Sequence, residues 1–406
     1  MNWEVKRMDE CCLSISDGDH LPPPKADKGV PFITITNIDP VYNTIDFSDT
    51  MFVPEDYFCS LQEIRKPREG DILYSVVGSF GIPVLIGGNH NFTFQRHIAI
   101  LRPNQDVVIP EYLYYVMKSR SFFAQADSYA IGSAQRTISL SSLRKMKIPV
   151  PDLTEQKRLA SVLSAFDNLI KVNNRRIKIL EQMAENLYKE WFVRFRFPGH
   201  ESISFENGIP KGWTINRIED IGSVVGGGTP STEHPEYWDG DIPWLTPADL
   251  ASFSDVYISS GSSFITKDGL KSSSTKMLPK NTVLLSSRAP IGYVAIAKNE
   301  ICTNQGFKNV ICDTNKVVPL YLFYFFKNNK ELLECYASGS TFLELSGGRL
   351  KKIKLVISPI EIQKLFVDRI GACLEQTEII NRVNQQLIRQ RDLLLPRLMS
   401  GKLEVN

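Results

Sequence analysis

The first 150 residues contain several short runs whose hydrophobic pattern is typical of β-strands. Residues 31–38 alternate apolar and polar side chains and are rich in β-branched ones, and residues 71–77, 82–86 and 92–101 are further runs of strand length. Turn-forming residues separate these runs. This pattern predicts a mixed β-sheet.

Two segments instead group their apolar residues at helical spacing. They are residues 111–119 and 320–327, and each predicts a helix packed beside strands. The first is rich in tyrosine, which suits either a core or a platform for stacking nucleic-acid bases. We expect core packing. Strands and a packed helix together predict an α+β fold around each of the two segments.

A longer helical pattern runs from Leu159 to Trp191. Alternate steps of four and three residues meet apolar side chains throughout, with Asn173 as the one polar member. A seam of this length predicts a coiled-coil helix over residues 154–194, with Asn173 as a buried amide that sets its register. About 207 residues later a patchier seam runs from Phe366, and we expect Pro396 to end it. The two helices are expected to pack antiparallel, and the alternative is two unrelated surface helices.

The whole pattern occurs twice, about 210 residues apart. Residues 3–8 align with 213–218, and residues 31–34 align with 243–246. Further anchors follow at Gly81 and Gly292, at Tyr112 and Tyr321, and at Gln156 and Gln363. A repeat of this length is a duplicated domain, so we expect a pseudo-two-fold internal repeat and a partner with two similar sites.

The repeat divides the chain into four parts. We expect module one at residues 1–151, a first long helix at 152–197, module two at 198–358, and a second long helix with a C-terminal tail at 359–406. If the helices are antiparallel, the modules lie at opposite ends of a spacer of fixed length.

Composition narrows the class of protein without naming a function. The 406 residues are 43% hydrophobic and 23% charged, as in a soluble globular protein of two or three domains. An odd number of cysteines, seven, and an N-terminus unlike a signal peptide favour the cytoplasm. No apolar run approaches the roughly 18 residues that span a bilayer. A net charge of +2 means that affinity for nucleic acid must come from local patches or a co-subunit.

Several stretches resemble catalytic or ligand-binding motifs but lack the required spacing. Residues 151–157 contain the letters of a metal-dependent nuclease site, yet the acids lie too close together and suit helix capping. Residues 39–42 lack the second proline of a methyltransferase loop, and residues 226–230 suit a flexible turn better than a phosphate loop. Residues 17–20 suit a turn better than a metal site, and the five histidines show no ligand spacing. We expect a protein that recognises rather than catalyses, with no metal or cofactor of its own.

Several motifs together resemble the specificity (S) subunits of type I restriction-modification systems. The likeness covers nearly the whole chain and is carried by residues 148–158, 187–193, 197–199, 208–213 and 394–403. Residues 227–231, 288–292 and 304–307 of module two are similar to motifs of the family's target recognition domains, with weaker counterparts at residues 17–20 and 132–135 of module one. Module one departs from the pattern by having residues 77–81 where module two has 288–292, so a contact made by Arg288 does not carry over.

The resemblance implies a division of labour. Each module would read one half of a split, asymmetric DNA site, and the helix pair would fix the unread spacer. Two modification subunits would methylate adenine with S-adenosylmethionine, and restriction subunits that use ATP and Mg would cleave. Two alternatives stay open: an enzyme that methylates or cuts DNA by itself, and a full-length competitor without modification partners.

Loop residues with suitable side chains are the candidates for contact with DNA bases or phosphates. They are Gln95, Arg96, Gln135 and Arg136 in module one, and Arg288, Asn304, Gln305 and Lys308 in module two. Equivalent positions after strands give a second set, Thr36, Asn37, Thr246 and Asp249. Three aromatic residues, Trp191, Phe192 and Phe195, are expected to face a modification subunit, with packing against module two as the alternative.

Overall fold

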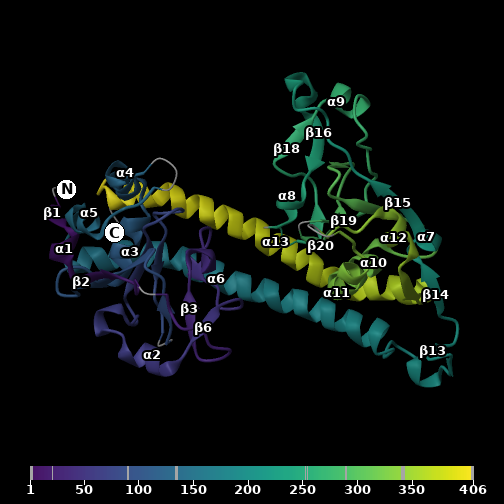
Figure 1. Cartoon of the computed structure of the whole chain (residues 1–406), viewed down its shortest axis with the longest axis horizontal. Coiled ribbons are helices and arrows are strands. Elements are labelled where there is room, and N and C mark those ends of the chain that lie inside the picture. The colour runs from purple at the N-terminus through teal and green to yellow at the C-terminus, as the bar shows by residue number, and fades with distance from the viewer. Residues whose placement is uncertain are drawn as a thin grey trace. The chain divides into compact units, whose positions relative to one another are not determined.

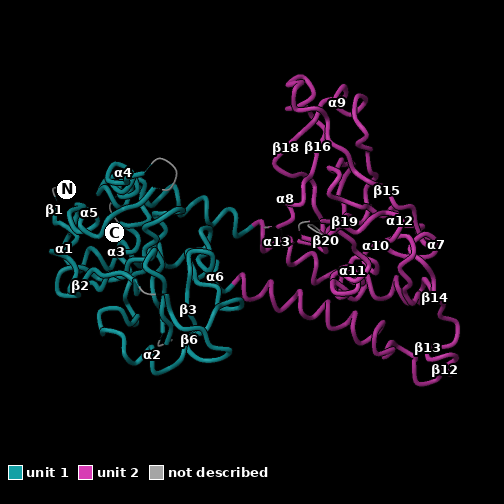
Figure 2. Tube along the Cα trace, in the orientation of Figure 1, with its two compact units in different colours: residues 1–172, 383–406 teal, residues 173–382 magenta. Residues whose placement is uncertain are grey.

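The computed structural model describes residues 3–20, 22–88, 91–132, 136–251, 253, 255–288, 290–339 and 343–403. The chain forms two compact units, one of residues 1–172 and 383–406 and the other of residues 173–382 (Figure 2). Two long helices, α6 (Leu153–Tyr188) and α13 (Ile360–Met399), each contribute to both units (Figure 1).

Module one, in unit 1, is built on a four-stranded antiparallel sheet in the order β2-β10-β7-β8. These strands are β2 (Cys12–Asp17), β10 (Ile98–Pro103), β7 (Ile72–Ser75) and β8 (Pro83–Leu85). A second sheet has β3 (Val30–Ile33) between β6 (Met51–Val53) and β9 (Thr93–Phe94), with β3 and β9 parallel. The remaining elements are α1 (Met8–Cys11), β4 (Ile38–Asp39), β5 (Thr44–Ile45), α2 (Glu55–Ser60), α3 (Pro110–Lys118), α4 (Arg120–Tyr129) and α5 (Leu140–Lys145).

Module two, in unit 2, repeats this plan with one added strand. Its five-stranded sheet has the order β15-β22-β19-β20-β17. These strands are β15 (Gly222–Gly226), β22 (Lys308–Cys312), β19 (Val283–Ser287), β20 (Ile291–Ala297) and β17 (Tyr257–Ile258). The second sheet has β16 (Trp238–Leu245) between β18 (Ser263–Ile265) and β21 (Cys302–Thr303), with β16 and β21 parallel. The helices are α7 (Ile218–Ile221), α8 (Pro247–Ala251), α9 (Lys267–Lys271), α10 (Pro319–Asn328), α11 (Lys330–Cys335) and α12 (Gly347–Lys352), and a hairpin of β12 (Phe205–Glu206) and β13 (Ile209–Pro210) precedes the module.

A two-stranded ladder closes each module just before its long helix. In module one, β1 (Glu4–Arg7) pairs with β11 (Lys147–Val150), and in module two, β14 (Thr214–Arg217) pairs with β23 (Lys354–Ile357). Equivalent tyrosines support the two ladders. The hydroxyl of Tyr112 donates to the Pro149 carbonyl at 2.9 Å, and that of Tyr321 donates to the Val356 carbonyl at 2.5 Å. Both tyrosines are buried, as expected for core packing.

A fully buried glutamine then ties each long helix to its own module. The side-chain oxygen of Gln156 accepts from the Ile109 N–H at 2.9 Å, and that of Gln363 accepts from the Val318 N–H at 3.0 Å. The amide nitrogen of each glutamine donates to two backbone carbonyls. We call this glutamine the clamp of its long helix. Strands, two-stranded ladders and glutamine clamps thus recur in the same order, which confirms the internal repeat and the α+β class.

The two long helices pack on each other as the seam predicts. In unit 1, Arg391 Nη1 lies 2.5 Å from Asp167 Oδ1, and in unit 2 the rings of Tyr188 and Phe366 lie 6.1 Å apart. The contact partner on α13 has a lower residue number when the residue on α6 has a higher one, so the helices run antiparallel. Asn173 is buried at 5% exposure, which agrees with a buried amide in the seam.

Three local predictions are wrong. Helix α13 passes Pro396 and continues to Met399, because Leu395, Leu398 and Met399 are buried in the core of unit 1 and that packing outweighs one lost hydrogen bond near a helix end. The strand predicted at residues 31–38 breaks at a turn of 3₁₀-helix over Ile35–Asn37. The strand predicted at 92–101 is two strands, because a tight turn interrupts it at residues 95–97.

Candidate nucleic-acid interface

That interrupting turn has an exact counterpart in module two. The Gln95 N–H donates to the Ile33 carbonyl and the Asn304 N–H to the Leu245 carbonyl, both at 2.9 Å. Each turn then closes on itself, with Ile98 N–H to Gln95 O at 3.1 Å and Phe307 N–H to Asn304 O at 3.3 Å. The first of the two central residues is Arg96 in one turn and Gln305 in the other, and both side chains are exposed.

A glycine packs against each of these turns. A Cβ at Gly18 would lie 2.1 Å from the Phe94 carbonyl oxygen, and one at Gly227 would lie 2.0 Å from that of Asn304. The loops at residues 17–20 and 226–230 are thus the same part of the repeat. In the second loop, the missing side chains of Gly227 and Gly228 allow close contact with neighbouring segments of the chain.

A third segment of the repeat carries Val77 in module one and Arg288 in module two. Val77 forms a bridge with Thr137, and Arg288 forms the equivalent bridge with Glu344. Both modules thus form the same backbone bridge at this position. They differ in its side chain, which is where module one departs from the family motif. Arg288 is half-buried.

Two of the candidates that follow β3 and β16, Asn37 and Asp249, support the turns after these strands. The side-chain oxygen of Asn37 accepts from the N–H of Thr34 at 2.9 Å and from its hydroxyl at 2.8 Å. Asp249 accepts from Thr246 in the same way, at 2.7 and 2.8 Å. Asn37 is buried, whereas Thr36 is exposed.

Asp249 has a second partner in Ser262. Its other carboxylate oxygen accepts from the Ser262 N–H and hydroxyl, both at 2.8 Å. Partial burial opposes ionisation, but the hydrogen bonds from Thr246 and Ser262 hold the pKa of Asp249 below its usual value. This carboxylate therefore organises its loop as an anion.

Two of the predicted basic residues are already paired. Arg136 donates to the carboxylate of Asp127 and, at 2.6 Å, to its carbonyl, and its guanidinium lies 5.6 Å from the Phe80 ring centroid. Lys308 Nζ lies 3.3 Å from Glu344 Oε1 and 3.3 Å from the Gln305 carbonyl oxygen. Gln135 lies outside the described residues.

Asn304 and Gln305 are held by other means. The Asn304 side-chain oxygen accepts from the Gly306 N–H at 2.9 Å, so it braces the turn. The side-chain oxygen of Gln305 accepts from the hydroxyl of Thr229, which belongs to the neighbouring glycine loop.

Two residues that the sequence did not single out, Arg65 and Tyr57, join the glycine loop of module one. Arg65 Nη1 lies 3.3 Å from Asp19 Oδ1, and the Tyr57 hydroxyl donates to Asp19 at 3.1 Å. Burial and this hydrogen bond raise the pKa of Tyr57 to about 12. Residues 17–20 thus form an ion-paired loop, and sequence distance hid its partners.

The predicted aromatic contacts with a partner lie in the core of unit 2. Trp191 and Phe192 are 6% and 5% exposed, and Phe192 packs on Tyr321 with ring centroids 4.7 Å apart. Phe195 stacks edge-on against Trp213 at 5.3 Å. This packing favours the alternative, in which the three rings join module two to the long helices.

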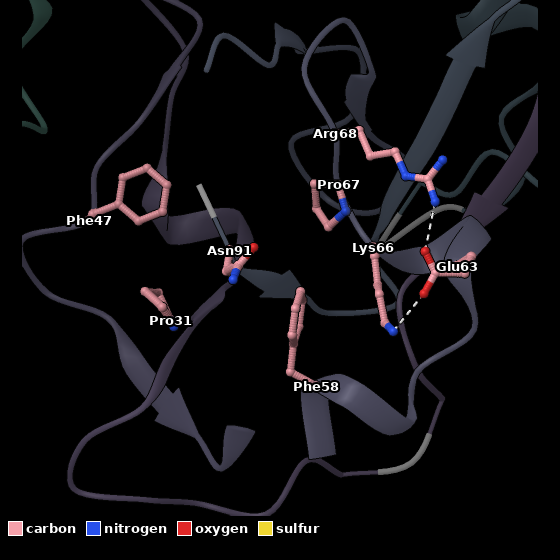
Figure 3. A pocket seen from close by; sticks show the side chains of 8 residues that line it. All are labelled: Pro31, Phe47, Phe58, Glu63, Lys66, Pro67, Arg68 and Asn91. Carbon is pink, nitrogen blue, oxygen red and sulfur yellow. Dashed lines mark hydrogen bonds and ion pairs between the residues drawn. The ribbon is translucent and has the colours of Figure 1, made fainter. Parts of the chain in front are cut away.

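A pocket of about 810 Å³ opens in module one (Figure 3). Figure 3 shows Phe47 and Phe58 on either side of it, with Lys66 and Arg68 both paired to Glu63. It shares no lining residue with the turns described above.

The described ranges contain neither a metal-binding cluster nor a membrane-spanning helix. No three His, Cys, Asp or Glu side chains in them lie close enough to hold a metal ion. None of the helices there is long and apolar enough to cross a membrane.

Comparison with known proteins gives a consistent match. The family described as type I restriction modification DNA specificity domain matches residues 1–182 and 210–389. The MjaIX specificity subunit of Methanocaldococcus jannaschii is 45% identical over 208 residues, which span 49% of this chain and 48% of that relative. The putative MjaX specificity subunit of the same organism is 27% identical over 418 residues, covering 100% of this chain and 94% of the relative.

A solved structure shares the fold. It is the S subunit of a type I restriction-modification system from M. genitalium, with a TM-score of 0.55 at 17% identity, covering 98% of this chain and 96% of that one. The family match defines the class as a DNA specificity component of type I restriction-modification systems. The chain belongs to the type I restriction-modification specificity subunit family.

Proposed function

We propose that this subunit recognises a bipartite, asymmetric DNA site with one half per module, and that it directs modification subunits to methylate adenine and restriction subunits to cleave. The observation that carries the proposal is the pair of equivalent turns. Their backbones make the same hydrogen bonds, while their exposed side chains are Arg96 in one module and Gln305 in the other. A shared frame with different base-reading groups suits two half-sites of different sequence.

The proposed DNA contacts start from these two turns and include the neighbouring loops. Arg96, Gln95, Arg288, Gln305 and Lys308 offer donors that suit base edges or phosphates. Asn304, Asn37, Thr246 and Asp249 act through the shape of the turns, because their polar groups bond to the surrounding loop. Thr36 is exposed and stays a candidate for direct contact.

The two long helices suit the role of a spacer. Each is continuous from one unit into the other, and each is clamped to a module by a buried glutamine. Residues 1–151 and 198–358 are the proposed recognition domains, joined by helical segments at 152–197 and 359–406.

A row of exposed apolar side chains on α6 suits a modification subunit. In unit 2 these are Ile179 and Met183, which are 47% and 55% exposed. Their spacing of four residues puts them on one face of the helix, where exposed apolar surface suits a protein partner. The modification subunit would bring S-adenosylmethionine, and a restriction subunit ATP and Mg.

The test separates this function from an enzyme that acts by itself. The purified chain is incubated with DNA and labelled S-adenosylmethionine, with and without modification subunits. Label on DNA only when both are present is the expected result. Label with the chain alone would contradict the proposal, and no label with both would favour a competitor without working partners.

A further inference from the structure

Arg96 and Gln305 occupy one and the same position of the repeat. Besides the bonds that close each turn, a third bond anchors it to the main sheet: Val76 N–H to His97 O at 2.9 Å in module one, and Ser287 N–H to Gly306 O at 2.8 Å in module two. Each exposed side chain therefore stands on a turn fixed to two sheets and packed against a glycine.

The two side chains are available for contact in different ways. No hydrogen bond or ion pair engages the Arg96 guanidinium within the part of the chain that the structure describes, unlike the paired Arg136. Gln305 accepts one bond from Thr229, which orients its amide, and among the described residues nothing else engages the second lone pair of its oxygen or its NH₂ group.

The chemistry of these groups points to different bases. A guanidinium donates two parallel hydrogen bonds to O6 and N7 of guanine, whereas a carboxamide donates to N7 and accepts from N6 of adenine. We propose, resting on the function above, that this repeat position determines specificity: Arg96 reads a guanine in the half-site of module one, and Gln305 reads an adenine in that of module two. Thr229 is the positioning residue for the Gln305 amide.

The rigid turn is what makes this position discriminating. A side chain on a mobile loop could follow either base, whereas one on a fixed turn presents its donors in a set direction. Lys308, the first residue of β22, is paired with Glu344. Its single ammonium group does not offer the two parallel donors by which a guanidinium identifies a base.

The experiment uses the full chain with its modification subunits and maps N6-methyladenine on genomic DNA. Arg96→Gln should change or relax a single guanine position in one half of the methylated motif and leave the other half unchanged. Gln305→Arg should do the converse, at an adenine in the other half. At the affected position, discrimination between bases should fall at least tenfold.

Arg120→Gln is the matched control, because Arg120 is also an exposed arginine of module one, at the start of α4. It should leave the motif intact. The unaltered chain tests the proposed function in the same map, since its motif must be bipartite and asymmetric.

A motif unchanged in Arg96→Gln, with methylation still active, would overturn this inference and leave the proposed function standing. If the variant abolishes methylation, competition binding with single base-pair changes decides. Loss of discrimination at one guanine supports the inference, whereas equal weakening on every sequence would mark Arg96 as a phosphate contact and overturn it.

Discussion

At the scale of single residues, the two modules share the glutamine that holds each long helix and differ at the exposed side chain of the equivalent turn. Gln156 and Gln363 make matching sets of three hydrogen bonds to backbone groups. Arg96 and Gln305 are equivalent in place and different in chemistry. The buried glutamine is thus the same in both copies, whereas the exposed side chain of the turn differs.

Removing a clamp should therefore destabilise the chain. Gln363→Ala removes a buried hydrogen bond to the Ser358 carbonyl and two partly buried ones to Val318 and Lys316. A buried group left unsatisfied costs about 1–3 kcal/mol and the partly buried ones less, so we expect a loss of about 2–4 kcal/mol in the free energy of unfolding. Urea unfolding of the full chain measures it. Lys364→Ala, on the exposed neighbour, is the control, and equal stability of the two variants would contradict the role of the clamp.

Lys118 predicts a dependence on pH. Burial lowers the pKa of its ammonium group to about 8, with Asp167 opposing the shift and Arg391 adding to it. Between about pH 8 and the unfolded pKa near 10.4, the unfolded chain binds more protons, so this group makes stability rise with pH. Lys118→Met should then stabilise the chain at pH 7 by about 1–3 kcal/mol.

The comparison of unfolding free energies at pH 7 and above pH 10.5 checks this. The advantage of Lys118→Met should vanish at high pH, since both states of the lysine are then neutral. An advantage that stays constant across this range would mean that packing, not charge, is responsible.

At the scale of elements, α6 and α13 combine an apolar seam with one buried ion pair. Arg391 is 4% exposed and lies against Asp167, whose other oxygen accepts from the Tyr115 hydroxyl at 2.7 Å. This network joins both helices to α3 within unit 1. A charge so placed is stable only while its partner remains.

Asp167→Ala should accordingly destabilise the chain by about 3 kcal/mol, because it leaves the Arg391 charge buried beside Asp392 alone. Adding Arg391→Leu should recover much of the loss. Urea unfolding of the two single variants and the double variant gives the coupling energy. Additive losses would contradict a coupled pair.

The exposed row on α6 carries a separate prediction. Replacing Ile179 and Met183 by serine should reduce co-purification of the modification subunit at least tenfold, since the apolar surface that the partner would cover is lost. Lys178→Ser with Gln182→Ser changes exposed neighbours on the same helix and serves as the control. Equal loss with the control pair would show that α6 itself was disturbed, and no loss in either would place the partner elsewhere.

Sequence patterns predicted the larger elements well because those depend on long periodic runs. The seam from Leu159 predicts the first long helix, and the repeat spacing predicts the second helix and the duplicated plan. The short turn at residues 95–97 was missed, since its flanking strands read as one apolar run. The Arg65–Asp19 pair was missed because 46 residues separate its members.

At the scale of the whole molecule, the repeat gives one chain two similar recognition modules and two helices shared between units. Such a protein should depend on its partners for chemistry and contribute the choice of site. Its modest net charge of +2 fits that role, because other subunits can provide phosphate contacts.

The most direct test of this account is a genome-wide map of N6-methyladenine in cells with and without this chain, with the genes for its modification subunits left in place. We predict that one bipartite motif with two different halves disappears when the chain is removed. A map that does not change, while the modification subunits are present and active, would contradict the claim that this chain selects the methylated site.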